Sequence, residues 1–265
     1  MEERKWEDLN LDCLLNVFER LGLGSLVLDV PFVCKSWYKA TLNPQCWRHI
    51  ELPTDRLNEP GVLGIIKFAI KHNARYVVSL KTPHNYNPAR KSCNSTKDLL
   101  VYIANECPFL KGFMMSPCLS PDQMCIVPSL ISKWTNLEWL TLQYSSYMQE
   151  ILTQVSLHCK NFVGLAITEA YFCDKEASDI ATLLPNIKYL CLSYAYLHED
   201  DLEIILRGCK ELLYLDVRYC VGFEEEEDEI LKLASHIPTF MCEGSREAIG
   251  GWWSRKREIY RPIDG

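Results

Sequence analysis

Apolar residues recur along this chain at two interlocked spacings. The first places three anchors at positions 1, 4 and 6 of a short segment and repeats every 25 residues over the second half of the chain. Its copies are Leu137, Leu140, Leu142; Phe162, Leu165, Ile167; Ile187, Leu190, Leu192; and Leu212, Leu215, Val217. Longer steps of 27 and 33 residues reach Leu110, Phe113, Met115 and Val77, Leu80, Thr82. This alternation predicts short strands with one buried face.

The second spacing is helical and precedes each of the later strands. Its clearest copy is Leu202, Ile205, Leu206 and Cys209, at i, i+3, i+4 and i+7. Each unit is therefore predicted to be an amphipathic helix followed by a strand. One such unit cannot bury its own apolar face, so neighbouring units must stack. The predicted fold class is an α/β solenoid of about six units.

Between the strand anchors lie residues predicted to face away from the helices and line the strand side of the solenoid. Those singled out for binding are Trp139, Thr141, Gln143, Tyr189, Ser193, Tyr214, Asp216 and Arg218. Aromatic residues flanked by an acid and an arginine have the composition of a protein-binding surface. The alternative is a stacked aromatic ladder that only stiffens the sheet.

The first fifty residues follow a different pattern, with apolar positions Leu11, Leu14, Leu15, Phe18 and Leu21 on one helical face. Asn10 is a candidate N-cap, and Gly22 and Gly24 are candidate terminators. Two more short apolar segments follow up to Trp47. Three short helices in about 45 residues are too few to bury a good core alone, so this module is expected to dock on another surface.

The pattern changes again after Phe223, where Glu224–Glu229 forms an unbroken acidic run. We expect this run to be solvated ahead of a capping helix at Ile230–Ser235. Attraction of a basic substrate is the alternative. Trp252 and Trp253 in the tail either dock back or recognise a partner. The predicted division is a module at 1–52, a linker at 53–60, repeats at 61–223 with an inserted loop at 82–96, and a cap and tail at 224–265.

Composition favours a binding protein without a cofactor. The net charge of −7 argues against nucleic acid as the main partner, and no apolar run is long enough to span a membrane. The amino terminus lacks the apolar core of a secretory signal. Thirteen cysteines, mostly at repeat anchors, indicate a reducing compartment, hence nucleus and/or cytoplasm. Without a Cys-x-x-Cys pair or clustered histidines no metal site is indicated, and His158–Cys159 is not a convincing catalytic pair.

The repeats resemble the leucine-rich repeat, Leu-x-x-Leu-x-Leu-x-x-(Asn/Cys), in its cysteine-containing, plant-like variety. Residues Cys209–Cys220 carry the motif most clearly, while Ser145, Ala170 and Ala195 depart from it at the ninth position. The resemblance implies a right-handed strand-helix horseshoe. The first module resembles the F-box, through Leu9-Asn10, Leu14-Leu15, Phe18, Val33–Trp37, Pro44 and Trp47–Ile50. The family has Leu-Pro where this chain has Leu9-Asn10.

The F-box resemblance implies a partner and a role. Members of that family bind the SKP-type adaptor, and through it a cullin, in SCF-type ubiquitin ligases. The residues this assigns to adaptor binding are Leu9, Asn10, Leu14, Leu15, Phe18, Val33, Cys34 and Trp37; the alternative is that they only pack the three helices together. The implied role is a non-catalytic receptor that selects an unknown protein substrate, with a scaffold that degrades nothing as the second hypothesis.

Overall fold

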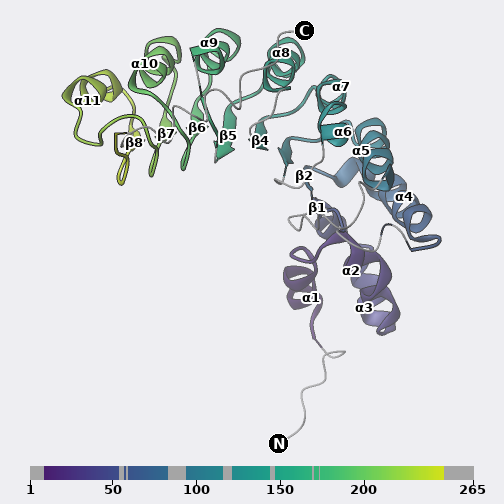
Figure 1. Cartoon of the computed structure of the whole chain (residues 1–265). Helices are drawn as coiled ribbons and strands as arrows, with labels where there is room; N and C mark the ends of the chain where they lie inside the picture. The colour runs from purple at the N-terminus through teal and green to yellow at the C-terminus, as the bar shows by residue number, and fades with distance from the viewer. Residues whose placement is uncertain are drawn as a thin grey trace, which may run out of the picture. The chain divides into compact units, whose positions relative to one another are not determined.

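The structure is a computed structural model that describes residues 9–53, 57, 59–82, 94–115, 121–143, 147–168, 170–172 and 174–247. The chain divides into two compact units. The first comprises residues 1–140 and 158–161, and the second comprises residues 141–157 and 162–265. Figure 1 labels most of the helices and strands of both.

The first unit begins with the short helices predicted from the sequence. They are α1 (Leu11–Phe18), α2 (Leu23–Leu28) and α3 (Lys35–Thr41), with 3-10 turns η2 (Val30–Phe32) and η3 (Pro44–Trp47). Asn10 caps α1 as predicted, because its side chain accepts a hydrogen bond of 2.8 Å from the backbone N–H of Cys13. The prediction that Gly22 and Gly24 end α1 is wrong. Gly22 is the N-cap of α2 and Gly24 lies inside α2.

The repeats of the first unit follow directly. They contain β1 (His49–Glu51), α4 (Val62–Asn73), η5 (Ala74–Tyr76), β2 (Ser79–Lys81), α5 (Asn94–Glu106), β3 (Gly112–Met114), α6 (Pro121–Met124) and α7 (Val127–Ile131). Strand β4 (Trp139–Gln143) begins in this unit and ends in the second. Strands β1, β2 and β3 pair in parallel in chain order. The sheet therefore starts inside the segment that the sequence assigned to the module, and buried Leu57 lies in the segment assigned to a linker.

The second unit is more regular. It contains α8 (Met148–His158), β5 (Gly164–Thr168), α9 (Asp174–Leu183), β6 (Tyr189–Cys191), α10 (Glu199–Gly208), β7 (Tyr214–Asp216), α11 (Asp228–Ala234) and β8 (Thr239–Met241). Its strands pair in parallel in chain order, with Leu190 opposite Leu215 and Leu215 opposite Phe240. The helices lie on one side of this sheet (Figure 1), as an α/β solenoid requires.

The predicted strand anchors form the core. Leu165, Leu190 and Leu215, which occupy position 4 of consecutive repeats, are all buried. Gly208 allows α9 and α10 to approach closely, because a Cβ there would lie 2.4 Å from the Cβ of Ala181. The central prediction of stacked strand-helix units is thus confirmed.

The repeat pattern continues beyond the predicted end at residue 223. Strand β8 pairs with β7, and Ile237, Phe240 and Cys242 stand 25 residues after Leu212, Leu215 and Val217. The predicted capping helix is therefore the helix of another repeat, α11, followed by its own strand. Within residues 82–96, positions 83–93 lie outside the described residues, as do Trp252 and Trp253.

Candidate binding surfaces

The helical module has its own buried core, built mainly from α1 and α2. Leu14, Leu15 and Phe18 are buried, and the Phe18 ring meets the Trp37 ring edge-on at 5.3 Å. The indole N–H of Trp47 donates a 2.7 Å hydrogen bond to the carbonyl of Thr41, which ties η3 to α3. These contacts join the helices of the module to one another.

The same module leaves other large apolar side chains in solvent. Phe32 is 78% exposed and Val33 is 57% exposed, both at the turn that leads from η2 to α3. Leu11, Val17, Tyr38 and Leu42 are also exposed. Exposed apolar side chains concentrated on a small module are a feature of a protein-binding surface.

The residues predicted for adaptor binding separate into two groups. Val33 and Asn10 are exposed; Leu9, Cys34 and Trp37 are partly exposed. Leu14, Leu15 and Phe18 are core residues in the isolated chain. Sequence reasoning omitted Phe32. Pro31 before it marks the start of a turn, since proline is tolerated in the first turn of a helix, but it does not show that Phe32 is exposed.

Beside this module, residues of η3 and η5 line an open hollow of about 500 Å³. Arg48 and Arg75 contribute positive charge, and Glu19 contributes negative charge. The Glu19 carboxylate accepts a 2.7 Å hydrogen bond from the Gln45 side-chain amide. Because positive and negative side chains both line this hollow, its charge does not favour an anionic ligand over a cationic one.

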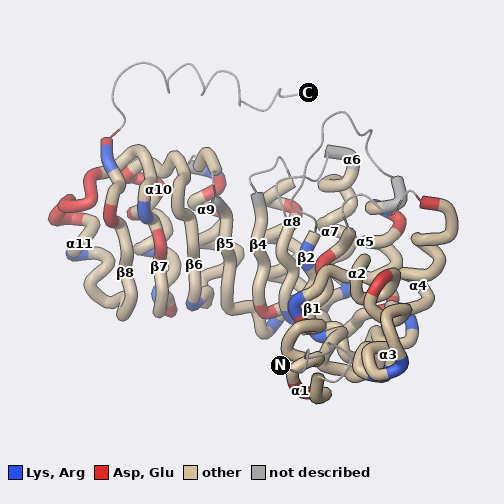
Figure 2. Tube along the Cα trace, turned by 90° about the horizontal axis from the view of Figure 1, so that it is seen from below, with Lys and Arg blue, Asp and Glu red and all other residues tan. Residues whose placement is uncertain are grey.

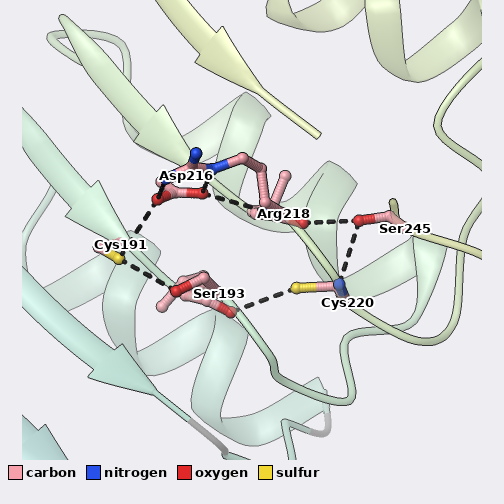
Figure 3. Close-up of polar contacts among 8 residues, drawn as sticks. Cys191, Ser193, Asp216, Arg218, Cys220 and Ser245 are labelled. Atoms are coloured by element: carbon pink, nitrogen blue, oxygen red, sulfur yellow. Dashed lines mark hydrogen bonds and ion pairs between the residues drawn. The ribbon is translucent and has the colours of Figure 1, made fainter. Parts of the chain in front are cut away.

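On the strand side of the second unit, Tyr189 and Tyr214 are register partners and both are half-buried. The adjacent ion pair joins Asp216 and Arg218 (Figure 3). The Arg218 guanidinium donates two hydrogen bonds of 2.9 and 2.8 Å to the two carboxylate oxygens of Asp216. The backbone N–H of Arg218 adds a third, of 3.1 Å. This arrangement fixes the orientation of the guanidinium.

The ion pair changes the acidity of both groups. Burial by itself would raise the pKa of Asp216, but hydrogen bonds and positive charge from Arg218 outweigh it and lower that pKa. The pKa of Arg218 is raised by the same hydrogen bonds and by the negative charge of Asp216. Asp216 is only 3% exposed, so Arg218 is the member of the pair that a partner would contact.

The other residues predicted for substrate binding differ in their exposure. Ser193 is buried, Trp139 is exposed and Thr141 is intermediate. The side chain of Gln143 lies outside the described atoms. The alternation of apolar and polar residues predicted which strand positions point away from the anchors. It did not predict that Asp216 and Ser193 are buried, because their burial depends on neighbouring repeats.

Polar bonds between repeats explain the residues at the ninth repeat position. The Cys220 thiol donates to the carbonyl of Leu192 at 3.2 Å, and the Ser245 hydroxyl donates to the carbonyl of Val217 at 2.7 Å. Ser245 also accepts a bond from the backbone N–H of Cys220 (Figure 3). Cysteine and serine therefore fill equivalent structural positions 25 residues apart.

The buried cysteines have poor chemistry for nucleophilic catalysis. Burial raises the pKa of the Cys159 and Cys209 thiols to about 11 and that of Cys107 to about 12. A thiol must be deprotonated to attack, so these groups are inert at neutral pH.

Among the described residues, no group of three His, Cys, Asp or Glu side chains is placed to hold a metal ion. None of the helices in the described part of the chain is long and apolar enough to cross a membrane.

The geometry thus defines a class of fold: a small helical module followed by stacked strand-helix repeats. Comparison with known proteins agrees. Residues 6–49 match the F-box domain family. An F-box/LRR-repeat protein of Arabidopsis thaliana is 25% identical over 98% of this chain and 79% of that protein.

Two further Arabidopsis thaliana proteins are similar. F-box protein SKIP19 is 26% identical over 83% of this chain and 70% of its own length. F-box/LRR-repeat protein 23 is 27% identical over 90% of this chain, which spans only 53% of that relative. With the observed repeats, these matches support an F-box protein with leucine-rich repeats.

Proposed function

We propose that this protein is a substrate-receptor subunit of an SCF-type, cullin-RING ubiquitin ligase. Its F-box binds the SKP-type adaptor, which links it to a cullin, and its repeats bind a target protein. The receptor needs no catalytic side chain, because holding a target lysine near activated ubiquitin raises the effective concentration of the reactants.

Adaptor binding is supported by the contrast between buried and exposed apolar residues within the module. Leu14, Leu15 and Phe18 satisfy an internal core, while Phe32 and Val33 remain in solvent on an F-box match. A monomer gains nothing by exposing two adjacent apolar side chains, whereas an interface buries them favourably.

Adaptor binding by the purified full chain tests this half. We expect Phe32→Ser combined with Val33→Ser to weaken the complex by about 2 kcal/mol or more, roughly 30-fold in Kd. Phe68→Ser is the matched control, because Phe68 is also exposed but lies on the repeat helix α4. Equal weakening by both variants, or by neither, would contradict the assignment of the surface.

We further propose that the protein acts in the nucleus and/or cytoplasm. The described cysteines are free thiols, which fits a reducing compartment. A fluorescent fusion of the full chain, imaged in cells, tests this location; accumulation in the secretory pathway would contradict it.

A further inference from the structure

Two tyrosines of the second unit adopt a backbone conformation that side chains rarely occupy. Tyr194 and Tyr219 have φ angles of 60° and 57°, and they are the non-glycine residues with positive φ in the described part of the chain. They stand 25 residues apart, just after strands β6 and β7. Their backbone N–H groups donate to the carbonyls of Arg218 and Glu243 at 3.0 and 3.1 Å. These bonds between repeats hold the left-handed conformation in place.

The two rings stack on each other in solvent. Their centroids are 5.0 Å apart and their planes differ by 17°. Tyr194 is 62% exposed and Tyr219 is 51% exposed. Tyr171 and Tyr196 also stack, at 4.7 Å, but both are partly buried. The Tyr194–Tyr219 pair is therefore an ordered aromatic surface open to a partner, with little side-chain freedom left to lose on binding.

The backbone of Gly244 lies against one end of the stacked tyrosine pair. Gly244 is the next residue in the series, 25 positions after Tyr219, and also has a positive φ of 75°. A Cβ at Gly244 would lie 2.6 Å from a ring carbon of Tyr219, so the glycine backbone lies against that ring. The backbone N–H of Gly244 in turn donates to the carboxylate of Glu225. An acidic side chain is thereby fixed next to the aromatic pair.

The sequence around the pair is strongly acidic. Residues 194–247 contain fourteen Asp and Glu but only five Lys and Arg, a net charge of −9 in a chain whose total is −7. Two of the five cations are already paired: Arg207 with Glu203, and Arg218 with Asp216. Figure 2 shows acidic positions gathered around α11 and the loop before it. Burial and then repulsion from Glu227, Glu203, Asp200 and Glu229 raise the pKa of Glu199, so a cation at the start of α10 would be favoured.

We propose that the Tyr194–Tyr219 pair docks an arginine- or lysine-bearing segment of the target protein, with the cation over an exposed tyrosine ring. Aromatic ring faces attract cations, and Glu225, whose carboxylate accepts from the Gly244 backbone against Tyr219, supplies negative charge at that end of the pair. This deepens the proposed function, on which it rests, by naming the chemistry of the target. A neutral or acidic target segment would gain nothing from the acids that surround the pair.

Fluorescence anisotropy with the purified full chain tests this inference. The probes are a labelled Gly/Ser peptide carrying several arginines and the same peptide with neutral citrulline at each arginine. We expect the arginine peptide to bind and the citrulline peptide to bind about tenfold more weakly. Equal binding of the two peptides would overturn the inference.

Variants separate the aromatic pair from the acidic surroundings. Tyr194→Asn with Tyr219→Asn removes both rings, and asparagine tolerates the left-handed conformation; binding of the arginine peptide should weaken about fivefold or more. Tyr194→Phe with Tyr219→Phe keeps the rings and should restore binding, while Tyr38→Asn on α3 is the exposed-tyrosine control. Undiminished binding by the asparagine variant would show that the acids alone hold the peptide and would overturn the role of the rings.

Failure of the inference is distinguishable from failure of the proposed function. The tyrosine variants should bind the SKP-type adaptor as the wild type does, because Phe32 and Val33 are unchanged. A wild-type chain that binds the adaptor but does not prefer the arginine peptide over the citrulline peptide contradicts the inference alone.

Discussion

Single residues in this fold are constrained mainly by contacts between repeats. Gly208 and Gly222 show this most clearly, since a Cβ on either would lie 2.4 Å from an atom of a neighbouring repeat, Ala181 or Leu197. Neither constraint is visible in the sequence, because both depend on how closely adjacent repeats pack. The same holds for Tyr194 and Tyr219, whose positive φ angles come from the bonds to the following repeat.

Replacing Gly208 by alanine tests the close packing of α9 and α10. We expect a loss of about 1–3 kcal/mol in the free energy of unfolding, because the new methyl group overlaps Ala181. Gly64→Ala is the matched control in α4, where no atom lies within 4 Å of the added Cβ. It should be neutral or stabilising by up to about 1 kcal/mol. Urea denaturation measures both; equal effects would contradict the close contact.

The Asp216–Arg218 pair makes a prediction about pH. The pKa of Asp216 is lower in the folded chain, so its carboxylate stabilises the fold above the unfolded-state pKa of about 3.9. That contribution is lost as the pH falls through the folded-state pKa. Asp216→Asn should cost about 1–2 kcal/mol at neutral pH, a modest value because Arg218 is partly exposed.

Unfolding free energies of the wild type and Asp216→Asn, measured from pH 7 to pH 3, check this prediction. The difference between the two proteins should be constant above about pH 5 and shrink below about pH 4. A difference that grows on acidification would mean that the ion pair does not stabilise the native state.

At the scale of elements, spacing predicted most of the repeat fold. Three anchors at positions 1, 4 and 6 located β6 and β7, and the helical spacing located α10. Two strands were missed. β1 was assigned to the F-box because His49–Glu51 begins two residues after Trp47, and β8 was missed because the acidic run interrupts the helical spacing before it. A search for Ile237, Phe240 and Cys242 at the 25-residue period would have found β8.

Truncation tests whether β8 belongs to the repeats. A chain ending at residue 223 removes the carbonyls of Met241, Glu243 and Arg246, which accept hydrogen bonds from Val217, Tyr219 and Gly222. We expect it to aggregate or to lose a substantial part of the 5–15 kcal/mol typical of a folded domain. A chain ending at residue 247 keeps these bonds and should melt near the full chain. If the full chain and the chains ending at residues 247 and 223 had the same melting temperature, α11 and β8 would add no stability.

At the scale of the whole molecule, the chain combines an F-box module with a set of repeats, and the two parts carry different kinds of sequence signal. The F-box could be identified from the order of its apolar residues, although the exposure of Phe32 could not. The binding face of the repeats was predicted only as a set of strand positions. Burial of Asp216 and the exposed tyrosine stack after β6 and β7 depend on register between repeats, which a single sequence does not specify.

The most direct test of the proposed receptor role compares the wild type with Phe32→Ser/Val33→Ser in cells, by quantitative isolation of complexes at low salt. The wild type should co-isolate the SKP-type adaptor and a cullin, and the variant should lose both while keeping the proteins bound by the repeats. At least one retained protein should carry less ubiquitin and live longer in cells that express only the variant. Wild-type complexes without adaptor or cullin would contradict the account, as would unchanged half-lives of every retained protein, the result expected of a scaffold that degrades nothing.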